Sequence, residues 1–185
     1  MGQVCQPQYG QPAIGFPQQE ASVPAEHLAH HAEPRQVYLA VVSDCFTKQV
    51  VGYAMADHIR TELVMQAMMM AHKRKAFIPG ITIFHSDRGC QYTSTELKVA
   101  AKVYGLRLSL GRTGTYYDNA WAESWNGTLK NERVNRTEYP TRKHAQIDIT
   151  QYIELRCNQI RLHSALGYRT PNEAETEWHQ QNTAA

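Results

Sequence analysis

The sequence carries two acidic residues in positions suited to ligand binding, Asp87 in HSDRGCQY and Glu123 in DNAWAESWNGTLKNE. Asp87 follows an apolar run typical of a buried strand, and open α/β sheets place their ligand-binding groups at that end of a strand. Glu123 has helical spacing to Asn119, Asn126 and Lys130, so these side chains share one helical face. The pattern predicts a metal ligand at Asp87 and a polar helix face with a cation around Glu123.

Each of the two residues also has a purely structural interpretation when it is taken alone. Asp87 is then an aspartate that caps a turn. Glu123 is then an ordinary surface glutamate on the solvated face of an amphipathic helix. Spacing alone does not choose between the two interpretations.

Strand-like and helix-like segments alternate through the first two thirds of the chain. Residues 37–44 and 48–55 are two β-rich runs separated by a short turn, which predicts an antiparallel hairpin. Thr61 is expected to cap a helix over residues 61–75. Further elements are expected at residues 81–87 (strand), 94–104 (helix) and 106–110 (strand). This alternation predicts an α/β sandwich.

The last third of the sequence has helical periodicity, with one helix over about 119–133 and another from about Thr141 to Cys157 or slightly beyond. Residues 179–185, after Trp178, are expected to form a polar tail that frays. Residues 1–36 are rich in Gln, Pro, Gly and His, so a disordered or non-native extension is expected there. One globular domain over residues 37–178 is therefore predicted.

Composition limits the class of protein without selecting a function. The 185 residues are 42% apolar and carry a formal net charge of +2, which suits one domain and is compatible with a nucleic-acid partner. The four cysteines (Cys5, Cys45, Cys90 and Cys157) are far apart and are expected to be reduced thiols. No membrane-spanning run or secretory signal is evident, so a cytoplasmic protein is predicted.

Three motifs, HSDRGCQYTS, DNAWAESWNGTLKNE and RLHSALGYRTPNEAE, together with the 35 residues between Asp87 and Glu123, resemble the transposases of two-frame bacterial insertion elements. That family belongs to the retroviral-integrase superfamily, whose core is a ribonuclease-H-like mixed sheet flanked by helices. The resemblance covers about residues 37–178. It implies metal-dependent cleavage and strand transfer at the ends of the element, with DNA as partner and a homo-multimer as the acting form.

By this resemblance, Asp87 and Glu123 are the second and third members of an Asp, Asp, Glu triad that holds Mg²⁺ or Mn²⁺ against the attacked phosphate. Hard oxygen ligands suit these ions. Lys130 matches a position that faces the DNA end, which predicts a phosphate contact. Asn119 and Tyr116 lie in the loop before the helix and are further candidates for DNA contact.

The terminal motif NQIRLHSALGYRTP has two interpretations. Arg161 and His163 contact DNA phosphate in the first. In the second, the motif packs against the core through Leu162, Leu166 and Tyr168. Both interpretations remain open from the sequence.

The family's first acidic residue is missing from its expected place. In the family it lies on the opening strand, in a motif resembling WVTDITYI about a dozen residues before VYLAVVSD. Here that stretch reads SVPAEHLAHHAEPRQ, with Glu26 and Glu33 as its only carboxylates, and Asp44 is expected at the hairpin turn. The sequence therefore predicts a lacking or altered first strand and a truncated element without its helix-turn-helix region.

Three functions remain compatible with these observations. The first is a transposase core whose catalysis is impaired because one metal ligand is missing. The second is a noncatalytic DNA-binding or multimerising fragment of such a transposase. The third is a ribonuclease-H-like nuclease of another family, against which the RLHSALGY motif argues.

Overall fold

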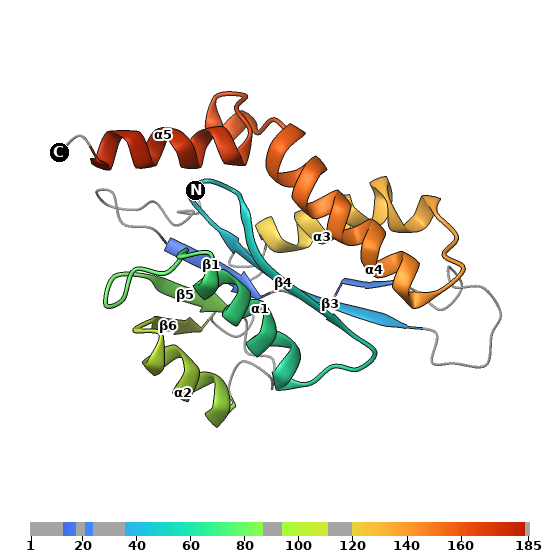
Figure 1. The fold of residues 1–185 in the computed structure, drawn as a ribbon, viewed down its shortest axis with the longest axis horizontal. Helices are drawn as coiled ribbons and strands as arrows, with labels where there is room; N and C mark the ends of the chain where they lie inside the picture. The colour runs from blue at the N-terminus through green and yellow to red at the C-terminus, as the bar shows by residue number, and fades with distance from the viewer. Residues whose placement is uncertain (1–12, 18–20, 24–35, 87–93, 111–119, 184–185) are drawn as a thin grey trace.

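The fold is a six-stranded mixed sheet with helices on both faces. Figure 1 shows α1 and α2 below the sheet and α3, α4 and α5 above it. The computed structural model describes residues 13–17, 21–23, 36–86, 94–110 and 120–183. This arrangement confirms the predicted α/β sandwich.

Strand β3 (Val37–Asp44) organises the sheet, because it pairs antiparallel with β4 (Val50–Ala56) along one edge and with two short strands along the other. The short strands are β1 (Ala13–Pro17) and β2 (Ala21–Val23). Strand β1 pairs in parallel with β5 (Ile83–Ser86), and β5 pairs in parallel with β6 (Arg107–Leu110). Strand β1 therefore lies in the middle of the sheet.

The presence of β1 and β2 changes the expectation for residues 1–36. The sequence predicted a disordered or non-native extension, whereas two segments of it form strands. Backbone pairing explains the difference, since β3 and β5 would otherwise face each other with unpaired N–H and C=O groups inside the sheet. The first strand is thus present in altered form, which agrees with one of the two predicted outcomes.

Helices α1 (Thr61–Lys73) and α2 (Thr95–Val103) cover one face of the sheet. Leu63, Ala67 and Met68 of α1 are buried in the core cluster that contains Phe84 of β5. Thr61 does not cap α1 as predicted, because the helix already includes it and Arg60 is the N-cap, with no side-chain hydrogen bond.

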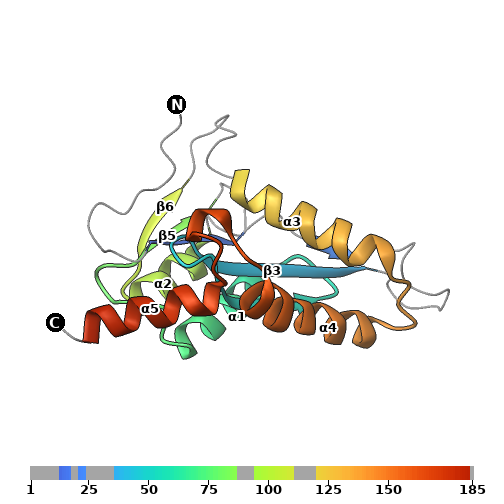
Figure 2. The same ribbon diagram turned by 90° about the horizontal axis from the view of Figure 1, so that it is seen from above.

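Three helical segments cover the other face: α3 (Ala120–Glu132), α4 (Arg142–Gln151) and the π-helix η4 (Tyr152–Ile160), which continues α4. Figure 2 shows α3 running along β3. The second core cluster joins Leu39 and Val41 of β3 to Leu129 of α3 and Ile153 of η4. The predicted helices over 119–133 and from Thr141 are confirmed, and Thr141 caps α4 by accepting a hydrogen bond from the His144 backbone N–H.

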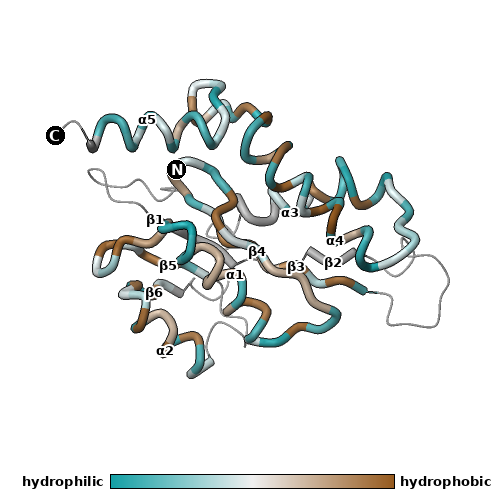
Figure 3. The backbone as a smooth tube through the Cα atoms, in the orientation of Figure 1, coloured by the Kyte–Doolittle hydropathy of each residue, from teal (hydrophilic) through white to brown (hydrophobic). Residues whose placement is uncertain are grey.

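Helix α5 (Pro171–Thr183) extends five residues beyond Trp178, where the sequence predicted a fraying tail. A capping box explains the stable start of this helix. The Thr170 hydroxyl accepts from the Glu173 N–H at 3.3 Å, and the Glu173 carboxylate accepts from the Thr170 N–H at 2.8 Å. The helix is mostly hydrophilic along its length (Figure 3), which is why apolar periodicity did not reveal it.

Candidate functional site

Helix α3 places Glu123 in its first turn, at the end nearest the loop that follows β6. Its buried face includes Asn126 and Leu129, which are 9% and 1% exposed. Glu123 precedes Asn126 by three residues and Lys130 by seven, so the three positions share one face of the helix. The side chain of Glu123 lies outside the part of the chain that the structure describes.

Strand β5 leads directly into Asp87, which lies just outside the described residues, as do Asn119 and Tyr116. Phe84 points into the core on the α1 side, so its neighbour His85 belongs to the opposite face, where its ring contacts the Ser109 hydroxyl at 3.0 Å. Helix α3 covers that opposite face. The face of β5 that carries His85 is therefore the face covered by α3, the helix that carries Glu123.

Strand β1 is hydrogen-bonded to β5 within the sheet, and its sequence is AIGFP. Gly15 pairs with His85 of β5 and with Ser43 of β3. Neither β1 nor β2 contains an aspartate or glutamate. The central strand thus lacks a carboxylate, and Glu26 and Glu33 lie outside the described residues.

Asp44 is the last residue of β3, and its carboxylate binds the hairpin turn that the sequence predicted at this place. Its carboxylate accepts hydrogen bonds from the Phe46 N–H at 2.9 Å and the Thr47 hydroxyl at 2.8 Å. Ile14 pairs with both Asp44 and Phe84, so Asp44 lies two strands away from β5. Strand spacing and rise put it roughly 12 Å from Ser86. Asp44 is therefore not adjacent to the end of β5 that leads into Asp87.

The end of α3 is held to α4 by Asp148. The Asp148 carboxylate accepts from Arg133 Nε at 2.7 Å and from the Tyr139 hydroxyl at 2.8 Å. Burial opposes ionisation of Asp148, but these two hydrogen bonds outweigh it and hold the pKa of the carboxyl below its ordinary value. Burial and the same carboxylate raise the pKa of Tyr139 to about 12.

Asp148→Asn is expected to destabilise the protein in a pH-dependent way. Because the folded pKa is depressed, the charge of Asp148 contributes fully above about pH 4, and its contribution is lost as the pH falls through the folded pKa. At pH 7 we expect the free energy of unfolding to fall by about 1 kcal/mol. Thermal unfolding from pH 7 to pH 2 measures this, and the difference from the unmodified chain should shrink toward pH 2.

The matched control for this prediction is Asp57→Asn. Asp57 pairs with Arg142 at 3.1 Å on the surface, where its side chain is 45% exposed. Such exposed pairs contribute little to stability, so this variant should unfold close to the unmodified chain. A destabilisation by Asp148→Asn that is the same at pH 7 and pH 2 would contradict the assigned role of its charge.

The remaining predicted DNA contacts differ in their surroundings. Lys130 is half-buried and makes no ion pair with the described part of the chain. Arg161 forms an ion pair with Glu132, the last residue of α3. Burial, with the positive charges of Arg161 and Lys48, lowers the pKa of His163. Arg161 thus lies close to His163 and also binds the end of α3, the helix that carries Lys130.

Of the three residues through which the terminal motif was predicted to pack, one is buried and two are exposed. Leu166 is buried, whereas Leu162 and Tyr168 are 58% and 73% exposed. The motif docks instead through Asn158, which is 3% exposed, and through Arg161. The sequence analysis did not single out Asn158 as a buried polar residue. It also did not single out Tyr152 and Glu132, where the Tyr152 hydroxyl donates a hydrogen bond to the Glu132 carboxylate.

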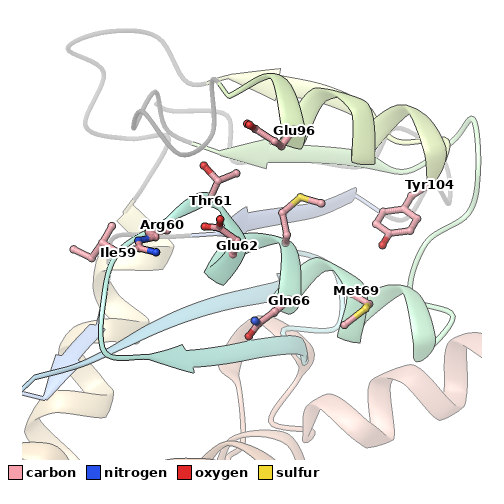
Figure 4. A pocket seen from close by; sticks show the side chains of 9 residues that line it. Ile59, Arg60, Thr61, Glu62, Gln66, Met69, Glu96 and Tyr104 are labelled. Atoms are coloured by element: carbon pink, nitrogen blue, oxygen red, sulfur yellow. The ribbon is translucent and has the colours of Figure 1, made fainter.

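A hollow of about 840 Å³ lies between α1 and α2 (Figure 4). Gln66 and Met69 of α1 line one wall, and Glu96 of α2 and Tyr104, which follows α2, line the other. It opens on the α1 side of the sheet, whereas α3 covers the other face. This hollow is therefore separate from the face that carries Glu123.

Within the described ranges, no three His, Cys, Asp or Glu side chains gather into a group able to hold a metal ion. Asp87 and the side chain of Glu123 lie outside those ranges. Among the helices that the structure describes, none combines the length and apolar character that a membrane span requires.

Strand order and helix placement define a ribonuclease-H-like fold. The catalytic core domain of BIV integrase superposes with a TM-score of 0.58 at 16% identity, over 85% of this chain and 98% of that one. The catalytic core of HTLV-2 integrase in complex with magnesium superposes with a TM-score of 0.53 at 17% identity, over 75% and 84% of the two chains. The fold is that of an integrase catalytic core.

The chain belongs to the integrase core domain family, whose models match residues 22–115 and 104–171. It is 37% identical over 139 residues to the transposase of insertion sequence element IS904 from Lactococcus lactis subsp. lactis, which is 75% of this chain and 54% of that protein. The chain thus spans about half the length of the curated relatives it matches. The family match begins at residue 22, so β1 lies outside it.

Proposed function

We propose that this chain is a transposase core that binds the DNA ends of an insertion element and is deficient in strand transfer. One observation carries the deficiency: β1 lies between β3 and β5 and contains no carboxylate. By resemblance, the family's first acidic residue belongs on the opening strand. The sheet thus has a strand at this position, but the strand does not carry the acidic residue.

Asp87 and Glu123 are the residues that would hold a divalent metal ion. Their carboxylates are the hard oxygen ligands that Mg²⁺ and Mn²⁺ prefer, so the donors fit in kind, but the set is one carboxylate short. When bound, such an ion activates the attacking oxygen and stabilises the leaving one. We expect weaker metal binding than in a complete triad, and correspondingly slow cleavage.

DNA is the partner that the basic and polar residues around α3 would bind. Lys130 would contact a phosphate. Two features support this: it shares the helical face of Glu123, and it forms no ion pair within the described residues. Asn119 and Tyr116 precede the helix and would contact the DNA end from the adjoining loop. We further propose that the chain acts as a homo-multimer on paired ends.

Cleavage and joining of a labelled DNA end from the flanking element tests this proposal. The assay uses Mn²⁺ and compares the unmodified chain with Asp87→Ala and Glu123→Ala. We expect end-specific product no higher than in either variant, together with measurable binding to the same DNA. Product that both substitutions abolish would show that the acidic site is complete, with Glu26 or Glu33 as the ligand to examine next.

A second function is favoured by the same feature of β1. A core that folds and binds DNA without cleaving it would occupy element ends as a noncatalytic or multimerising fragment. Addition of this chain to an intact related transposase distinguishes the two. Inhibition that grows with the concentration of the chain supports the fragment, and unchanged product formation argues against it.

A further inference from the structure

The side chain of Asn158 forms two hydrogen bonds with the backbone of Val50, the first residue of β4. Its side-chain oxygen accepts from the Val50 N–H at 2.9 Å, and its side-chain nitrogen donates to the Val50 carbonyl at 3.0 Å. Asn158 is 3% exposed and Val50 is fully buried. A buried side-chain amide that is satisfied on both atoms is a specific contact, because leaving either atom unpaired costs free energy.

Arg161, three residues further on, binds the last residue of α3. Its Nη2 atom lies 2.5 Å from a carboxylate oxygen of Glu132 and donates to the Tyr152 hydroxyl at 3.2 Å. The Tyr152 hydroxyl donates to the same Glu132 oxygen at 2.8 Å. Burial opposes ionisation of Glu132, yet the hydrogen bonds from Arg161 and Tyr152 keep its pKa below the ordinary value.

These two contacts come from one short stretch at the end of the π-helix η4. One contact reaches β4, which pairs with β3, and the other reaches α3. A π-helix is rare and frequently marks a functional position. The stretch therefore connects the sheet that leads to Asp87 with the helix that carries Glu123.

We propose that Asn158 and Arg161 form a clasp that fixes α3 over the sheet and thereby sets where Glu123 lies relative to β5. Arg161 is in this role a positioning residue, and its guanidinium is committed to Glu132. The clasp gives a role to the two polar residues at the ends of NQIR, since Asn158 is buried and Arg161 is half-buried, whereas Ile160 between them is 56% exposed. The importance of the position of Glu123 rests on the proposed function. The contacts that form the clasp do not depend on that function.

Direct phosphate contact by Arg161 is the competing role. Its Nε atom is buried and has no hydrogen-bond partner in the described part of the chain, and the positive charges of Arg161 and Lys48 both act on His163. The two roles predict different measurements. A phosphate contact contributes to the salt dependence of DNA binding, whereas a clasp contributes to the stability of α3.

Amide hydrogen exchange tests the clasp directly. Arg161→Gln and Glu132→Gln should each raise exchange of α3 amides at least about tenfold, and the double variant should add little to either because both remove one interaction. Arg161→Lys keeps the charge with fewer donors, so it should fold and show a smaller effect of the same kind. Unchanged α3 exchange in all of these variants would overturn the clasp.

Arg74→Gln is the matched control. Arg74 caps the end of α1, pairs with Glu154 of the same π-helix at 2.5 Å and donates to the Val50 carbonyl at 3.5 Å. Among the described residues, no hydrogen bond or ion pair joins it to α3. Arg74→Gln should lower the melting temperature without a selective rise in the hydrogen exchange of α3 amides. An equal rise of α3 exchange in this control would show that Arg161 acts only through global stability, which would also overturn the clasp.

DNA binding at several salt concentrations separates this inference from the proposed function. If the clasp is right, Arg161→Gln and Glu132→Gln leave the slope of log K against log salt unchanged. A slope reduced by about one in Arg161→Gln alone would assign Arg161 to phosphate contact instead. If neither the unmodified chain nor any variant binds element ends, the proposed function is wrong. The hydrogen-exchange results then still test whether the clasp exists.

Discussion

Gly15→Asp is expected to raise metal-dependent cleavage of element ends at least about a hundredfold over the unmodified chain, because it returns a third carboxylate to the site. Gly15 pairs with His85, two residues before Asp87 in the sequence. His85 and Ser43, the two partners of Gly15, both belong to the sheet face that α3 covers. A side chain introduced at this position would therefore point toward the helix that carries Glu123.

Gly15→Asn is the matched control, since its side chain has nearly the same shape without the charge. Asn should leave cleavage at the level of the unmodified chain, and adding Asp87→Ala to Gly15→Asp should abolish the gain. Affinity for Mn²⁺, measured by calorimetry, should rise with Asp at position 15 and not with Asn. A folded Gly15→Asp protein with neither tighter Mn²⁺ binding nor cleavage would contradict the assignment of β1 as the deficient strand.

Gly52→Ala is expected to be the most destabilising single-methyl addition in the described part of the chain. Gly52 lies on β4 where α1 crosses the sheet, and a Cβ atom there would lie 2.2 Å from the Ala67 carbonyl oxygen and 2.9 Å from the Ala71 nitrogen. Both are backbone atoms of α1, so they cannot move without shifting the helix. We expect the free energy of unfolding to fall by about 3 kcal/mol or more.

Denaturant unfolding monitored by circular dichroism measures this loss. Gly127→Ala is the control, because Gly127 lies within α3 and a Cβ atom there would meet nothing within 4 Å. Alanine is favoured over glycine in a helix, so this variant should gain about 0.5–1 kcal/mol. Equal stability of Gly52→Ala and the unmodified chain would mean that α1 does not approach β4 as closely as the structure indicates.

Local signals predicted most of the elements that surround the candidate site. The hairpin of β3 and β4, the helix α3 and the strand before Asp87 all follow from periodicity and turn residues over short windows. Arg60 rather than Thr61 caps α1, an error of one residue in a boundary that periodicity sets poorly. The capping box of Thr170 and Glu173 was legible in the sequence but belongs to a helix with little apolar periodicity.

The N-terminal strands could not be predicted in the same way. The segment AIGFP has one glycine and one proline and lacks an alternating pattern, so nothing local favours a strand there. Its place between β3 and β5 depends on pairing with residues about thirty and seventy positions away. Pairing partners at such separations are properties of the assembled sheet, which supplies the hydrogen bonds that the segment does not specify by itself.

The sequence by itself determined the family motifs, the spacing of Asp87 and Glu123 and the absence of a carboxylate from residues 13–17, because residue identity and interval are properties of the chain. Only the tertiary structure decided that those residues form the central strand, that Asp44 is level with Phe84 two strands away and that Arg161 binds Glu132. The bond of Asn158 to Val50 joins residues 108 positions apart. Contacts of this kind arise when buried polar atoms must find partners inside a packed fold, and no local pattern encodes which partner they find.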